Sequence, residues 1–127
     1  MARMWRTRLA LLFIPVLGWG CAPPIPDGGF RAPDPASRIY AAIGVAQEFQ
    51  RTGEEPAKPI LRDLVEMLIS ADPAERLVAS DTLRLVTGQN FGYLPYAPMP
   101  ERRMAAERWT TWVQQQPSPP SSEASST

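Results

Sequence analysis

The sequence lacks histidine altogether and has one cysteine and one lysine among its 127 residues. Histidine is the commonest acid–base group near neutral pH and the commonest metal ligand, so both kinds of site lose their usual residue. A single cysteine excludes intramolecular disulfides and CxxC metal sites. A serine nucleophile would have to use Lys58, which falls in a predicted turn. We therefore expect no enzyme activity, no metal and no cofactor.

The chain also lacks a surplus of charge of either sign, since 13 basic and 13 acidic residues give a formal net charge of zero. Sequence-independent binding to nucleic acid needs a positive surplus, so we expect no nucleic-acid partner. Proline, in contrast, is abundant, with 15 residues. Its positions divide the chain into segments.

The first twenty residues show the three zones of an export signal. Arg3, Arg6 and Arg8 form a basic start, residues 9–17 form an apolar run that only Pro15 interrupts, and Gly18-Trp19-Gly20 form the exit. A membrane-spanning helix needs about 20 apolar residues, whereas the apolar part of a signal peptide needs only about 7–15. The pattern predicts a signal peptide over residues 1–20 and an exported protein.

The cysteine follows this signal directly, with the small residue Gly20 before it. This arrangement resembles the lipobox of bacterial lipoproteins, in which the cysteine receives a diacylglycerol thioether and becomes the new N-terminus. The resemblance implies an envelope protein held at a membrane by acyl chains on Cys21. The alternative is cleavage by an ordinary signal peptidase, which would leave Cys21 as a free thiol.

Composition divides the rest of the chain into three parts. Residues 21–33 are rich in proline and glycine and predict an extended tether. Residues 117–127 carry no large apolar side chain and predict a disordered tail. Between them, residues 34–116 show helical spacing of apolar residues and no strand-like alternation, which predicts an all-α domain. The expected helices cover residues 35–51, 58–70, 73–87 and 100–115.

Capping residues mark the first and third of these helices. Asp34 and Asp72 each precede a proline, which is the pattern of an N-cap followed by proline at the first helical position. Glu75 stands where a capping box has its carboxylate. The third helix has a wide apolar arc that predicts neighbours on two sides, made of Val78, Ala79, Thr82, Leu83, Leu85 and Val86. The expected apolar side of the fourth helix consists of Met104, Ala105, Trp109, Trp112 and Val113.

The segment 34–38 recurs as 72–76, at an offset of 38 residues. A helical unit of this length is typical of HEAT-type solenoids. The second copy resembles that family in its Asp-Pro turn, followed by Arg76, Ala79 and Leu83. The region from about residue 34 to residue 113 is similar to short bacterial HEAT-repeat lipoproteins. The resemblance implies a short right-handed αα-solenoid of about four helices.

Arginines and aromatic residues are the candidate structural or partner-binding positions: Arg38, Arg76, Arg102, Arg103, Tyr93, Tyr96, Trp109 and Trp112. The first two arginines begin equivalent helices, where they would hold neighbouring units in register or bind an acidic partner. The other two lie in the first turn of a helix, where the dipole disfavours a cation, so pairing with an acid or a partner is expected. The acidic residues Asp63 and Glu66 are expected on a solvated surface.

Aromatic residues before and within the fourth helix are expected to close the open end of the stack. Phe91, Tyr93 and Tyr96 would form a lid over it, or alternatively a shallow binding platform. The favoured function is a non-catalytic module that binds an unidentified envelope protein or serves as a structural subunit. The alternative is a small-ligand carrier or enzyme accessory with a pocket made by those residues and Trp109. A third reading is a remnant of a longer repeat protein.

Overall fold

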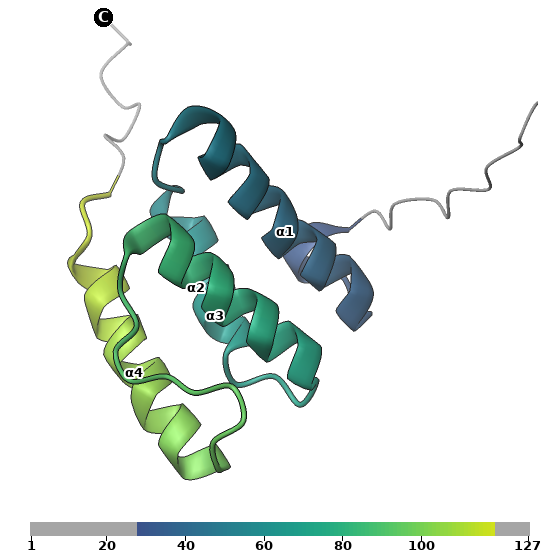
Figure 1. Ribbon diagram of the computed structural model, residues 1–127, viewed down its shortest axis with the longest axis vertical. Helices are drawn as coiled ribbons and strands as arrows, with labels where there is room; N and C mark the ends of the chain where they lie inside the picture. The colour runs from purple at the N-terminus through teal and green to yellow at the C-terminus, as the bar shows by residue number, and fades with distance from the viewer. Residues whose placement is uncertain (1–27, 119–127) are drawn as a thin grey trace, which may run out of the picture.

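The computed structural model describes residues 28–118, which form four α-helices, one short 3₁₀ turn and no strand (Figure 1). The elements in chain order are η1 (Gly29–Arg31), α1 (Pro35–Thr52), α2 (Lys58–Met67), α3 (Pro73–Thr87) and α4 (Met99–Gln115). The prediction of an all-α fold is confirmed for this part of the chain. The predicted signal peptide, Cys21 and the last nine residues lie outside the described residues.

Side-chain caps and left-handed glycines fix the ends of α1 and α3. The Asp34 carboxylate accepts hydrogen bonds from the Ser37 backbone N–H at 2.8 Å and from its hydroxyl at 2.9 Å. Asp72 accepts from the N–H groups of Ala74 and Glu75 at 2.8 and 2.9 Å. Both helices end at a glycine with φ near 70°, a conformation that glycine adopts without steric cost.

The capping box at the start of α3 is completed differently from the prediction. Ser70 Oγ, rather than the Glu75 carboxylate, accepts the backbone N–H of Asp72 at 3.1 Å. The Glu75 side chain turns inward and is only 1% exposed. This frees its carboxylate for an interior ion pair.

Helices α1 and α3 lie side by side and run in the same direction (Figure 1). Arg38 meets Glu75 near the two N-termini, and Thr82 donates to the Ala42 carbonyl halfway along, at 3.4 Å. Helix α2 runs the opposite way and also packs against α3. Helix α3 thus contacts two other helices, in agreement with its wide apolar arc.

Helix α4 runs in the same general direction as α3 and antiparallel to α2. Residues 88–98 return along α3, because Arg76 at the start of α3 donates to the Pro95 carbonyl at 3.0 Å. Lys58 at the start of α2 donates to the Gln114 carbonyl at the end of α4, at 2.9 Å. Helices α3 and α4 therefore do not form an antiparallel hairpin, and the αα-solenoid stays a prediction.

The core contains residues from all four helices and from the loop before α4: Ala42, Leu61, Leu64, Val65, Met67, Leu68, Ala79, Leu83, Val86, Tyr93, Ala105, Ala106, Trp109 and Val113. Two residues expected in it are instead exposed, Leu85 at 42% and Met104 at 56%. Each lies at the edge of its helix's apolar arc.

The folded part begins earlier than the predicted boundary at residue 34. Residues 28–33, expected in the tether, include the turn η1, which packs against α1. Ala32 is buried, and its carbonyl accepts a hydrogen bond from Arg38 Nη1 at 2.6 Å. This contact fixes the segment against the domain, which composition alone did not indicate.

Candidate functional site

Arg38 is part of a buried polar cluster between α1 and α3. Its Nε donates to Glu75 Oε1 at 2.6 Å, and its Nη2 lies 2.5 Å from the same oxygen. The Ser70 hydroxyl donates to the other oxygen of Glu75. Both oxygens of the buried Glu75 carboxylate have hydrogen-bond partners, one a cation and the other a hydroxyl. We therefore infer that the Arg38–Glu75 pair has a structural role in the packing of α1 against α3.

Arg76 occupies the equivalent position on α3 and donates hydrogen bonds to backbone carbonyls. Its Nη1 donates to Ser70 and Ala71, both at 2.9 Å, and its Nε donates to Pro95. These carbonyls belong to the turn after α2 and to the loop before α4. Arg76 thus joins three segments, as a basic side chain beside free helix-end carbonyls often does.

Tyr93 and Arg102 lie close to that junction. The Tyr93 hydroxyl donates to the Leu68 carbonyl at 2.5 Å, and burial raises the pKa of its phenol, against smaller lowering by Arg102 and Arg76. Arg102 Nε donates to the Ala97 carbonyl at 2.9 Å. No carboxylate among residues 28–118 pairs with Arg102 or with the exposed Arg103. The expected pairing with an acid of this domain is therefore not seen.

The aromatic residues divide into a buried group and an exposed one. Trp109 is 1% exposed and packs edge-on against Phe91 and Trp112, with ring centroids 4.7 and 5.8 Å away. Tyr93 is also buried, whereas Tyr96 is 75% exposed and takes no part in the predicted lid. Because Tyr93 and Trp109 present almost no surface, these aromatics do not together line a ligand pocket.

The two acidic residues of α2 differ in exposure to solvent. Glu66 is exposed, as expected, but the Asp63 side chain is only 15% exposed and accepts a hydrogen bond from Arg31 at 3.2 Å. No group of acidic or sulfur side chains in the described part of the chain could hold a metal ion. None of the helices within residues 28–118 has the length and apolar character needed to cross a bilayer.

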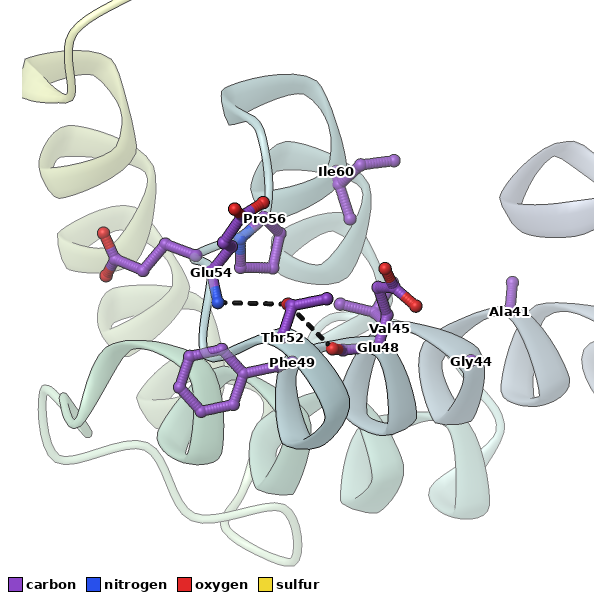
Figure 2. Close-up of a pocket in the computed structure, with 10 residues that line it drawn as sticks. Ala41, Gly44, Val45, Glu48, Phe49, Thr52, Glu54, Pro56 and Ile60 are labelled. Carbon is purple, nitrogen blue, oxygen red and sulfur yellow. Dashed lines mark hydrogen bonds between the residues drawn. The ribbon is translucent and has the colours of Figure 1, made fainter.

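Among the grooves on the surface of the described domain, one lies between α1 and α2 (Figure 2). Its volume is about 370 Å³, within the range of small binding sites. The lining comes from one face of α1, the turn after it and the start of α2: Ala41, Gly44, Val45, Glu48, Phe49, Thr52, Glu54, Glu55, Pro56 and Ile60. In Figure 2, Val45, Glu48 and Thr52 rise from α1 on the side that faces Pro56 and Ile60. We call this feature the α1–α2 groove.

All the charged groups that line the α1–α2 groove are acidic. Glu48 pairs with Arg51, whose Nη2 donates to Glu48 Oε1 at 2.5 Å, and this hydrogen bond lowers the pKa of the glutamate. The carboxylates of Glu54 and Glu55 have no hydrogen-bond or ion-pair partner among the described residues. The nearby Lys58 is directed to the carbonyls at the end of α4. The groove therefore combines an apolar floor with an acidic rim.

Sequence reasoning did not identify this groove. The signal was present as Ala41, Val45, Glu48 and Thr52, which share one helical face of α1. Neither that face nor the pair Glu54-Glu55 was given a role from the sequence.

Comparison of the chain with protein-family models, with curated proteins and with solved structures found no match in any of the three. The likeness to HEAT-repeat lipoproteins therefore stays a prediction from the residues.

Proposed function

We propose that the chain is an exported lipoprotein of the bacterial cell envelope, anchored through Cys21, and that its small helical-repeat domain binds another protein or serves as a structural subunit without catalysis. The supporting observation is that the candidate arginines make contacts within the domain, whereas a groove on its surface is left open. The predicted arginines Arg38 and Arg76 are occupied by contacts within the domain. The α1–α2 groove is apolar, open and covered by nothing in the described chain.

The repeat character of the domain is supported by the two equivalent arginines. Arg38 and Arg76 begin helices that lie side by side and run in the same direction. Each joins its own helix to the next segment of the stack, one through Glu75 and the other through Pro95. A solenoid unit that contacts its neighbours through repeated positions has this form. Repeat surfaces bind partners without catalytic groups, which fits the residues available here.

Site-specific photocrosslinking in the native envelope tests protein binding. A photoreactive residue at position 41 lies in the α1–α2 groove, and one at the exposed position 107 of α4 serves as the comparison. We expect one dominant protein adduct from position 41, identified by mass spectrometry. Absence of a protein adduct from every exposed position tried would contradict the binding function.

Replacement of the cysteine tests the anchor separately. Cys21→Ser removes the thiol that would carry the lipid, so the protein should move from the membrane fraction to the soluble fraction. Metabolic labelling with a radioactive fatty acid should be lost in the same variant. Unchanged membrane attachment of Cys21→Ser would contradict lipidation.

A further inference from the structure

We propose that the α1–α2 groove binds a basic amphipathic helix, and that the partner protein contributes this helix. The inference rests on the proposed protein-binding function and adds the site and the chemical class of the segment that occupies it. Three features of the groove support it: the shape of its floor, the sign of its rim charge and the position of the neighbouring cations.

The floor suits the apolar side of a helix. Its residues on α1 fall at the spacing of one helical face, and Ile60 and Pro56 form the opposite wall. Gly44 also lines the groove, and a Cβ built there would meet no atom within 4 Å. The missing side chain leaves a depression in which an apolar residue can approach the backbone of α1. A groove between two helices that takes apolar residues at i, i+3, i+4 and i+7 is a common mode of helix recognition.

The rim favours a cationic occupant. Glu54 and Glu55 are exposed and unpaired within the described residues, and Glu48 lies beside them with its own cation, Arg51. No basic residue lines the groove. Lysines or arginines flanking the apolar side of an incoming helix would therefore meet carboxylates, and such complementarity raises both specificity and association rate.

Charge also makes a second copy of this chain a poor occupant. Two copies that met through their α1–α2 grooves would bring the same glutamates together, and like charges in contact oppose association. The only lysine that could relieve this, Lys58, already donates to the Gln114 and Gln116 carbonyls. An anionic ligand is disfavoured for the same reason.

Two model peptides test the inference directly on the purified full-length chain. Both have 18 residues with leucines at i, i+3, i+4 and i+7 spacing; one carries lysines at its polar positions and the other carries glutamates. Binding is measured by fluorescence anisotropy of the labelled peptides. We expect the lysine peptide to bind at least about tenfold more tightly than the glutamate peptide, and to weaken as salt is added.

Matched variants localise the binding. Gly44→Leu fills the depression, and leucine is a good helix former, so the helix should persist. Gln47→Leu makes the same kind of change on another face of α1. Glu54→Lys with Glu55→Lys reverses the rim charge, and Glu107→Lys is a charge-reversal control on α4. We expect the groove variants to bind the lysine peptide at least about tenfold more weakly than the native chain does. The control variants should bind it with unchanged affinity.

Equal affinity for the two peptides, or full affinity in Gly44→Leu, would overturn the inference. So would the absence of any binding of the lysine peptide. These outcomes leave the proposed function to be decided by the crosslinking experiment in the envelope, where a protein adduct lacking a basic amphipathic segment would confirm binding and reject the basic helix. Failure of the two proposals is thus distinguishable.

Discussion

At the scale of single residues, the ion pair of Arg38 and Glu75 joins two partners that differ in burial. The carboxylate is fully buried, whereas 24% of the arginine side chain is exposed. Removal of one partner from a buried pair costs more than the pair contributes, because the other charge stays desolvated. The cost should therefore depend on which partner is removed.

We expect Arg38→Met to destabilise the domain by about 3–5 kcal/mol, since it leaves the Glu75 charge buried beside one hydroxyl. Glu75→Gln should cost less, because the remaining arginine reaches solvent and still donates to the Ala32 carbonyl. Urea unfolding of each variant measures the difference. Replacing both residues, Arg38→Met with Glu75→Leu, should recover part of the loss. Equal costs for the two single variants would contradict this account.

Tyr93 should make the domain sensitive to alkali. Burial raises the pKa of its phenol above the ordinary value of 10.0, so the folded state keeps the proton after the unfolded state has released it. The stability associated with the neutral phenol is therefore present below about pH 10 and is lost as pH rises toward the folded-state pKa. We expect Tyr93→Phe to show a smaller loss of stability between about pH 9 and pH 11 than the native chain. Tyr96→Phe, at an exposed position, should behave like the native chain.

The role of a single residue could be predicted where the sequence around it occurs twice in the chain. The equivalence of Arg38 and Arg76 follows from the repeat of residues 34–38 at 72–76, and both side chains make interior contacts. Glu75 was assigned to a cap because its spacing from Asp72 fits one. Its burial depends on Arg38 and Ser70, which approach it only in the folded chain, so spacing along the sequence could not reveal it.

At the scale of elements, the ends of α1 and α3 follow from their local sequence. At each N-terminus an aspartate accepts from free N–H groups and a proline removes one donor, and at each C-terminus a glycine N–H donates to a carbonyl of the last turn. The path of α4 does not follow from local sequence. Its direction depends on hydrogen bonds from Arg76 to Pro95 and from Lys58 to Gln114, which join residues 19 and 56 positions apart.

The cap of α1 should contribute to acid sensitivity. The Ser37 backbone N–H and hydroxyl donate to the Asp34 carboxylate and lower its pKa below 3.8. A lowered folded-state pKa gives stability that is present above the unfolded value and lost as pH falls through the folded value. Asp34→Asn keeps an acceptor but does not titrate, so it should lose less stability than the native chain between about pH 5 and pH 2. Thermal melting at the two pH values measures this, and identical acid losses would exclude the role of Asp34.

At the scale of the whole molecule, an aromatic cluster covers one part of the helical surface and a groove leaves another part open. The aromatic cluster of Phe91, Trp109 and Trp112 covers the side toward α4. The α1–α2 groove is covered by no other part of the described chain. If the proposed repeat character holds, an end unit would need a polar cap, and an apolar groove left open there would suit a surface that another protein covers.

Closure by the aromatic cluster makes the domain dependent on one indole ring. Trp109 is among the largest fully buried side chains, and its replacement by alanine should cost about 3–5 kcal/mol. A domain of this size has only ~3–5 kcal/mol of net stability, so Trp109→Ala should unfold much of it. Circular dichroism during heating measures the helix content that remains. Tyr96→Ala, at a 75% exposed position, should stay within about 0.5 kcal/mol of the native chain. A melting curve of Trp109→Ala close to the native one would mean that the four helices hold together without the aromatic cluster.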